Sequence, residues 1–293
     1  CENLDPTDDI ARFDRLAKKI VHDYNKPDIA ALQEIQDNDG PADTGTVSGE
    51  LTGKMLCDAI ERAGGPKYRY VEIAPENNKD GGEPGGNIRV AYLVREDRIK
   101  LDEKKLRRVG VGDPAFEITR KSLELHATFI PTGKKLVLFN DHFSSKGGAD
   151  PVFGERQPPQ DPTHAKRIAQ QRAVHKRMVE VAAEFPDAAI GAIGDKNWTP
   201  GEAVKNTEAS VRSKIQNVSA ELPEDNGRSY IFMGNAQNID QLQVHVGTKV
   251  TLEVDDSNPR LPYGHPDRDS DHGHLIALFD MRVAKPRRRS QAA

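Results

Sequence analysis

The apolar stretches of this chain are short, and none exceeds the length of a β-strand. The longest cover residues 188–193 and 275–279, whereas a membrane-spanning helix needs roughly 18 apolar residues. Residues 123–129 alternate between apolar and polar side chains, which predicts a strand with one buried face. Residues 188–193 are apolar throughout and predict a strand buried on both faces. Both patterns suit a sheet between helices and a second sheet, so we predict a layered α/β sandwich without a membrane span.

The remaining periodicity divides the chain into helices and strands, with no internal repeat or linker. Apolar residues at helical spacing predict helices over residues 8–24, 52–63 and 163–184. Strands are predicted over residues 29–33, 68–73, 88–94, 122–130, 135–140, 188–193, 239–246 and 274–283. Residues 74–87 and 144–162 are predicted to be long functional loops. We predict a single domain over residues 1–284 and a basic, disordered tail over residues 285–293.

Composition excludes further classes of protein. With 36% apolar and 30% charged residues in periodic segments, the chain is not a disordered polyelectrolyte. A formal net charge of −4 gives no general attraction to nucleic acid, so local positive charge or a bound metal must hold any polyanionic partner. Cys1 and Cys57 are too few for a disulfide framework and lack the spacing of a zinc site. A Cys1–Cys57 bridge and two free thiols are both left open.

Short polar clusters lie at the ends of several predicted strands. They are Gln33-Glu34, Asn140-Asp141-His142, Gly194-Asp195-Lys196-Asn197 and Ser270-Asp271-His272. The first three follow their strands and the fourth precedes its strand. If the last strand runs antiparallel to the others, all four clusters lie on one rim of the sandwich.

The side chains of these clusters suit phosphate chemistry. Carboxylates that converge without cysteine suit a hard cation such as Mg²⁺ or Mn²⁺. Imidazole and amide groups beside such an ion suit the hydrolysis of a phosphodiester, in which an oriented water attacks phosphorus while cations and donors stabilise the developing charge. Each cluster alone is also an ordinary turn or strand end. Their shared chemistry and order favour a common site.

The motifs also resemble those of a known family. The order Glu-Asn-Leu, Leu-Gln-Glu, Asn-x-His-Phe-x-Ser-Lys-Gly-Gly, Gly-Asp-x-Asn and Ser-Asp-His is similar to the endonuclease/exonuclease/phosphatase superfamily of DNase I-like phosphoesterases. Its bacterial extracellular nuclease branch is suggested by Asp80-Gly81-Gly82, Gly86-Asn87-Ile88-Arg89, Arg120-Lys121-Ser122-Leu123, Lys146-Gly147-Gly148, Phe153-Gly154, Gln157-Pro158-Pro159 and Gly234-Asn235-Ala236-Gln237. The resemblance covers about residues 2–279. It implies a four-layered α-β-β-α sandwich of two mixed sheets flanked by helices.

The resemblance implies a role for each matching residue. The expected metal ligands are Glu34, Glu2 and Asp271. Five residues are expected to be catalytic. Asp195 would orient or deprotonate the attacking water, and Asn197 would hold the water or phosphate. His142 and His272 would contact phosphate oxygens, and Asp240 would orient His272. The expected phosphate-binding residues are Arg120, Lys146, Arg89 and Asn87.

The chain also departs from the family pattern. The family places an Asn one position before Cys1, so the first strand of the domain is expected to be truncated here. Lys196 stands where the family has an apolar residue, and it either points to solvent or adds charge beside the phosphate. Trp198 either stacks on a base or sugar or packs under its loop.

These observations predict a metal-dependent phosphodiesterase, in particular a sequence-nonspecific nuclease acting on DNA, with RNA left open as a further substrate. The resemblance implies that the nuclease is secreted. Its ion is expected to be Mg²⁺ or Mn²⁺, with a role for Ca²⁺ left open. No obligate protein partner is indicated. The alternatives are a phosphoesterase for small-molecule or lipid phosphates and a catalytically impaired nucleic-acid-binding homologue.

Overall fold

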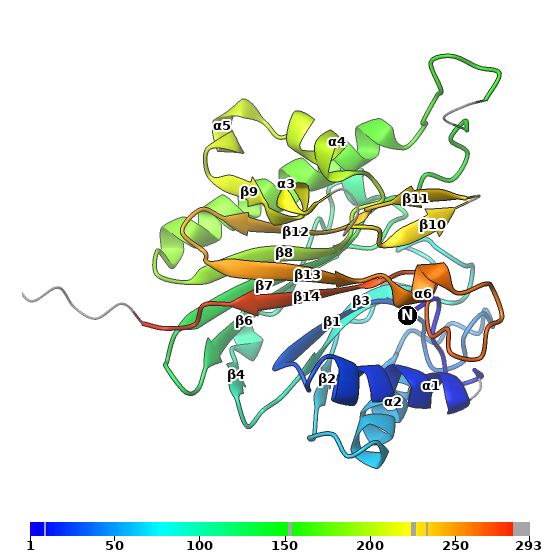
Figure 1. Ribbon diagram of the computed structural model, residues 1–293, viewed down its shortest axis with the longest axis vertical. Coiled ribbons are helices and arrows are strands. Elements are labelled where there is room, and N and C mark those ends of the chain that lie inside the picture. The colour runs from blue at the N-terminus through cyan, green and yellow to red at the C-terminus, as the bar shows by residue number, and fades with distance from the viewer. Residues whose placement is uncertain (9, 152–153, 224–226, 233, 284–293) are drawn as a thin grey trace, which may run out of the picture.

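The computed structural model describes residues 1–8, 10–151, 154–223, 227–232 and 234–283. Two β layers pack face to face, and helices cover their outer faces (Figure 1). The α-β-β-α sandwich is therefore confirmed. The predicted tail over residues 285–293 lies outside the described residues. No helix in the described ranges has the length and apolarity required to cross a membrane.

The three predicted helices are present, and the structure contains several short helices that were not predicted. They are α1 (Ile10–Lys18), α2 (Glu50–Arg62), α3 (His164–Glu184), α4 (Pro200–Lys205), α5 (Ala209–Arg212) and α6 (Ser257–Arg260). A π-helical turn, Lys19–Asp23, continues α1, and 3-10 turns span Glu103–Lys105, Pro114–Phe116 and Val218–Glu221.

The strands include all the predicted ones and several that were missed. They are β1 (Ile29–Ile35), β2 (Arg69–Val71), β3 (Arg89–Val94), β4 (Ile99–Leu101), β5 (Arg107–Val109), β6 (Ser122–Phe129), β7 (Lys135–His142), β8 (Ala189–Asp195), β9 (Ile215–Asn217), β10 (Tyr230–Phe232), β11 (Asn235–Gln237), β12 (Asp240–His245), β13 (Val250–Asp255) and β14 (His274–Phe279). Most of the missed strands have three residues, which is too short for alternation to be recognised.

The larger sheet is mixed. Its order is β4-β6-β7-β8-β12-β9, with β5 also paired to β6, and β7 and β8 are its parallel pair. The other β layer contains the antiparallel sheet β1-β3-β2 and the antiparallel pair β13–β14. The hairpin of β10 and β11 lies beside α6 at one end of the sandwich (Figure 1).

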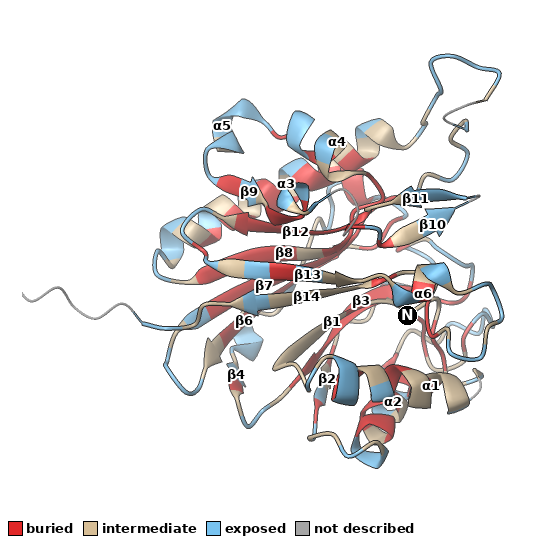
Figure 2. Cartoon of the chain, in the orientation of Figure 1, coloured by how far each residue is buried: buried red, intermediate tan, exposed pale blue. Residues whose placement is uncertain are grey.

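Alternation along the central strands builds the core. Leu136 and Leu138 of β7 pack with Tyr92 of β3 between the two β layers. Val137 and Phe139 point the other way and pack against α3. Because successive side chains of a strand face opposite sides, one strand supplies both cores. Figure 2 shows the resulting concentration of buried residues in the central strands.

A cleft of about 700 Å³ lies between the edge strands β1 and β14. The N-terminal residues continue along the same edge of β1, where Leu4 forms a parallel bridge with Ile35. The amino group of Cys1 donates to the carbonyl of Gln33 at 3.0 Å. Cys1 and Cys57 are both free thiols, so the Cys1–Cys57 bridge is absent from this structure.

Candidate active site

Neighbouring strands of the larger sheet place three of the predicted catalytic side chains in one row. His142 of β7 is the register partner of Asp195 of β8, which is also the partner of Asp240 of β12. Paired residues of adjacent strands project from the same face of a sheet. His142 Nε2 accordingly lies 3.6 Å from an Asp195 carboxylate oxygen. The row lines the cleft, together with Glu34 and His272. The prediction that the polar clusters share one rim is confirmed by this arrangement.

The turn after β8 fixes the Asp195 carboxylate. Gly194 precedes it with a φ of +138°, and a Cβ there would lie 2.0 Å from the carbonyl oxygen of Asp141. Only glycine permits this close approach of the backbones. Asn197 follows with a φ of +54° and donates its backbone and side-chain N–H groups to the two Asp195 oxygens, at 2.7 and 2.8 Å. Asn197 therefore orients the carboxylate, and its expected contact with water or phosphate stays a prediction.

A β-bulge presents Glu34 to the cleft. The register of β1 with β3 shifts between Leu32 and Ile35, and Glu34 has a φ of +58°. This left-handed conformation is rare for a residue with a Cβ, and such strain concentrates at functional sites. One Glu34 carboxylate oxygen lies 3.8 Å from His142 Nε2. The bulge thus turns the carboxylate of an edge strand toward the catalytic row.

Asn140 joins the two β layers beneath the site. Its side-chain amide donates to the backbone carbonyls of Leu32 and Ala91, at 2.9 and 2.8 Å. Its oxygen accepts from the side chain of Gln33. These bonds tie β7 to β1 and β3, so they fix Glu34 relative to His142.

His272 reaches the row from the loop before β14. Its Nδ1 lies 2.7 Å from a carboxylate oxygen of Asp240, which is buried. Burial disfavours the charged imidazole, but the carboxylates of Asp240 and Asp195 outweigh it and raise the pKa of His272 to about 10. His272 is therefore a cation at neutral pH.

His142 and Asp195 are shifted in ways that suit a neutral donor and a general base. Burial, reinforced by the positive charge of Arg120, holds the pKa of His142 well below its usual value. Burial raises the pKa of the Asp195 carboxyl to about 7, a rise that the charge of His272 opposes and that of Asp240 reinforces. A carboxylate with a pKa near 7 can accept a proton at physiological pH. The two imidazoles therefore differ in charge because their environments differ.

Two of the carboxylates expected to hold a metal, Glu2 and Asp271, lie close enough for their charges to interact. Burial, followed by the negative charge of Asp271, raises the pKa of Glu2. Asp271 has one buried carboxylate oxygen without a hydrogen-bond partner. An orphaned carboxylate oxygen beside a second carboxylate fits a hard cation, which would satisfy both. Within the described residues, no three histidine, cysteine, aspartate or glutamate side chains already form a metal-binding group. The fit to a metal ion therefore rests on the neighbouring carboxylates of Glu2 and Asp271 and on the unpartnered oxygen of Asp271.

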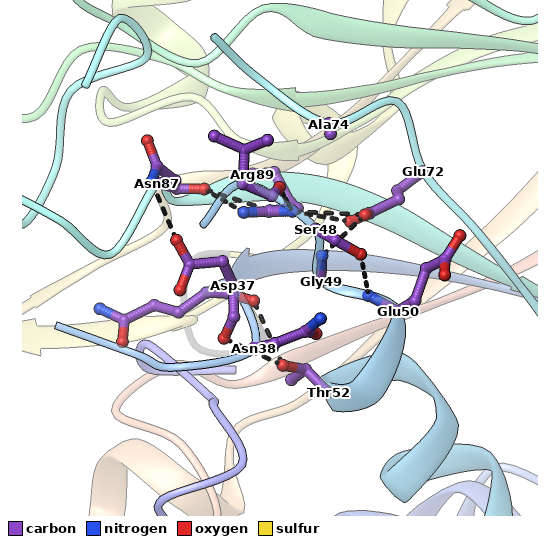
Figure 3. Close-up of polar contacts among 12 residues, drawn as sticks. Asp37, Asn38, Ser48, Gly49, Glu50, Thr52, Glu72, Ala74, Asn87 and Arg89 are labelled. Carbon is purple, nitrogen blue, oxygen red and sulfur yellow. Dashed lines mark hydrogen bonds and ion pairs between the residues drawn. The ribbon is translucent and has the colours of Figure 1, made fainter. Parts of the chain in front are cut away.

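Two predicted phosphate ligands, Asn87 and Arg89, are wrong, because other protein groups occupy them. Arg89 is 2% exposed, and its guanidinium bonds Glu72 at 3.1 Å and the carbonyl of Asn87 at 2.8 Å (Figure 3). Asn87 is also buried, and its amide donates to Asp37 at 2.9 Å (Figure 3). These bonds tie the loop over residues 74–87 to Asp37, just after β1, and to Glu72, just after β2.

The base-stacking role of Trp198 is also wrong. Trp198 is fully buried, its carbonyl accepts from the Gln241 side chain, and its ring meets His164 edge to face at 6.0 Å between centroids. Lys196, expected in solvent or beside the phosphate, is fully buried and paired with Asp141. In both cases the β8 turn directs the side chain away from the cleft and into the protein.

Truncation of Trp198 should therefore lower stability. We expect Trp198→Ala to reduce the free energy of unfolding by about 3–5 kcal/mol, because the site cannot close around so large a cavity. Urea unfolding followed by circular dichroism measures this change, since Trp198 is the single tryptophan and its fluorescence is lost with it. Trp198→Phe, which keeps part of the ring volume, should lose less. A higher KM without loss of stability would restore the stacking role.

Arg120 remains beside the site, and other residues join it. Arg120 is buried, donates to the carbonyl of Phe143 at 2.9 Å, and is close enough to Glu34 and Asp195 for their charges to act on it. Lys146 lies 3.4 Å from the side chain of Gln237 and 4.0 Å from a carboxylate oxygen of Glu202, and its phosphate role stays a prediction. Tyr230 was missed by sequence reasoning, because a bridge to His272 from a distant part of the chain brings it there.

Comparison with known proteins identifies the fold. TDP2 from Danio rerio, solved with a single-strand DNA product, has a TM-score of 0.59 at 18% identity, covering 94% of each chain. An endonuclease/exonuclease/phosphatase from Bacteroides vulgatus has a TM-score of 0.58 at 15% identity, covering 93% of this chain and 91% of its own. A mannosyl-6-phosphatase from Bacteroides thetaiotaomicron has a TM-score of 0.56 at 16% identity, covering 92% and 90%.

The chain therefore has the DNase I-like fold of the endonuclease/exonuclease/phosphatase superfamily. No protein-family model matches it, and no curated protein matches its sequence. At these identities the likeness concerns the fold, so the reaction has to be argued from the site.

Proposed function

We propose that the chain is a metal-dependent phosphodiesterase that hydrolyses nucleic acid. The observation that carries the proposal is the row His142–Asp195–Asp240, with His272 bound to Asp240 and Glu34 facing His142 across the cleft. This row joins a base, a neutral donor and a buried cation. Structural similarity to a protein solved with a single-strand DNA product supports nucleic acid as the substrate.

The proposed reaction assigns one task to each residue. Asp195, oriented by Asn197, takes the proton of the attacking water as its oxygen bonds to phosphorus. The P–O bond to the leaving strand breaks, and the leaving oxygen takes a proton from solvent. His272, held by Asp240, donates to a non-bridging phosphate oxygen as negative charge develops there, and neutral His142 donates to a second oxygen. Arg120 adds positive charge beside them. Glu34, Glu2 and Asp271 would hold Mg²⁺ or Mn²⁺, which when bound supplies Lewis-acid stabilisation of the phosphate.

A second candidate is a phosphatase for small phosphate esters. The similar fold of the Bacteroides thetaiotaomicron mannosyl-6-phosphatase favours it. The two functions differ in substrate and product. A phosphodiesterase cleaves a diester and leaves a phosphate monoester, whereas a phosphatase cleaves a monoester and releases inorganic phosphate. A catalytically impaired homologue is disfavoured by the intact row of catalytic groups.

A substrate panel tests this proposal. The purified chain with Mg²⁺ is incubated with an end-labelled single-stranded DNA, the RNA of the same sequence, a DNA duplex and mannose 6-phosphate. We expect shortened DNA strands, with RNA as a further substrate, and no inorganic phosphate from the sugar phosphate. Phosphate release with intact nucleic acids would instead establish the phosphatase.

The resemblance to bacterial extracellular nucleases extends the proposal to a secreted enzyme of that branch. Cleavage activity in the culture medium of the source cells, absent after deletion of the gene, would support secretion. Activity confined to the cell pellet would contradict it.

A further inference from the structure

The hairpin of β10 and β11 places two aromatic rings beside the catalytic row. Tyr230 forms an antiparallel bridge with His272, and their ring centroids are 4.6 Å apart. Phe232 lies two residues further along β10, and its ring is stacked on that of Tyr230, with centroids 6.3 Å apart and planes within 9°. The rings therefore run outward from the catalytic histidine in one line.

The inner ring belongs to the site and the outer ring is open. Burial and the charges of Asp271 and Asp195 raise the pKa of Tyr230, so the ring that contacts His272 also lies near these carboxylates. Phe232 is 51% exposed. Figure 2 shows the hairpin as a largely exposed element at the end of the sandwich. An exposed aromatic ring stacked on a ring of the active site offers a flat apolar face to a substrate.

Cationic side chains flank the two rings. Arg268 lies close enough to Tyr230 for its charge to lower the pKa of the phenol. Lys146 contacts Gln237 of β11 on the other strand of the hairpin. Proteins usually bind single-stranded nucleic acid with aromatic rings, on which the bases stack, and with cationic side chains along the phosphate backbone.

We infer that Tyr230 and Phe232 form a stacking subsite for the base next to the scissile phosphate, which makes unpaired nucleic acid the substrate class. The inference rests on the proposed phosphodiesterase function. Bases inside a duplex are already stacked on each other, so they reach this face only when unpaired. Stacking tolerates every base, which agrees with cleavage that is not sequence-specific.

Two substrates that differ only in their bases test the subsite. One is a single-stranded oligothymidylate, and the other is an abasic oligonucleotide of the same length and phosphate count. We expect the wild-type protein to cleave the thymidylate with a kcat/KM at least about fivefold higher, which is the lower end of the benefit from one stacked base.

Three variants show whether the aromatic ring of Phe232 causes that preference. Phe232→Ala and Phe232→Leu should bring the ratio between the two substrates toward one, and the leucine variant keeps apolar volume without an aromatic face. Ile231→Ala is the matched control, because Ile231 lies on the opposite face of β10 and is also exposed. It should keep the wild-type ratio. Melting temperatures verify that each variant folds.

The outcomes separate the two proposals. Cleavage of neither oligonucleotide by the wild-type protein would overturn the phosphodiesterase function and the subsite with it. Equal cleavage of both, or a wild-type ratio retained by Phe232→Leu, would overturn the stacking subsite and leave the phosphodiesterase function standing.

Discussion

Asp195→Asn is expected to lower kcat by at least about a hundredfold while the protein stays folded. The amide has nearly the shape of the carboxylate and can keep an oxygen toward Asn197, but it cannot accept a proton from water. Circular dichroism and the initial rate of oligonucleotide cleavage measure the two parts of this prediction. Asp187→Asn is the matched control, since Asp187 is exposed in the turn before β8, the strand that carries Asp195. It should retain full activity.

The pH dependence gives an independent signature of Asp195. Its carboxyl has an ordinary pKa of 3.8, and the folded protein raises this to about 7. The base must be deprotonated to act, so kcat/KM should fall about tenfold per unit as pH decreases below about 7. With an unshifted carboxyl the fall would start near pH 4. A rate that stays constant from pH 7 to pH 5 would rule out Asp195 as the titrating base.

His272→Ala is expected to lower kcat by about a hundredfold to a thousandfold, the range found when one pre-oriented donor to a developing oxyanion is removed. The variant also leaves Asp240 buried without its cation and beside Asp195. Initial rates at saturating substrate measure the effect. His22→Ala, at an exposed position of the turn after α1, is the control.

A double variant shows whether His272 and Asp240 act as one unit. Residues that act together are strongly non-additive. We expect Asp240→Asn with His272→Ala to be little slower than His272→Ala alone. Losses that multiply would mean that Asp240 acts independently of His272, contrary to the 2.7 Å contact.

The position of the site was predictable from sequence because its groups end strands. Glu34, His142, Asp195 and His272 each adjoin an apolar run, and such runs in a layered sheet bring their ends to one rim. The Glu34 bulge was not predictable, because it depends on pairing with β3. The structure brings these side chains together, and their catalytic roles stay predictions.

The two wrongly assigned cations share one physical cause. Arg89 beside glycines and Lys196 beside Asp195 have the local sequence of phosphate ligands, but Glu72, just after β2, and Asp141 of β7 neutralise them. A cation needs a carboxylate when it is buried, and that partner is set by the tertiary fold. Trp198 was likewise ambiguous, since only the path of the β8 turn decides whether it faces the cleft or the core.

The most direct test of the proposed function is the cleavage of an end-labelled single-stranded DNA by the purified chain in Mg²⁺, Mn²⁺, Ca²⁺ or EDTA, in parallel with Asp195→Asn and Asp187→Asn. We predict shortened strands in Mg²⁺ or Mn²⁺ from the wild-type protein and the Asp187 variant. EDTA or Asp195→Asn should abolish this cleavage. Cleavage that persists in EDTA, or at the wild-type rate in Asp195→Asn, would contradict a metal-dependent phosphodiesterase centred on Asp195.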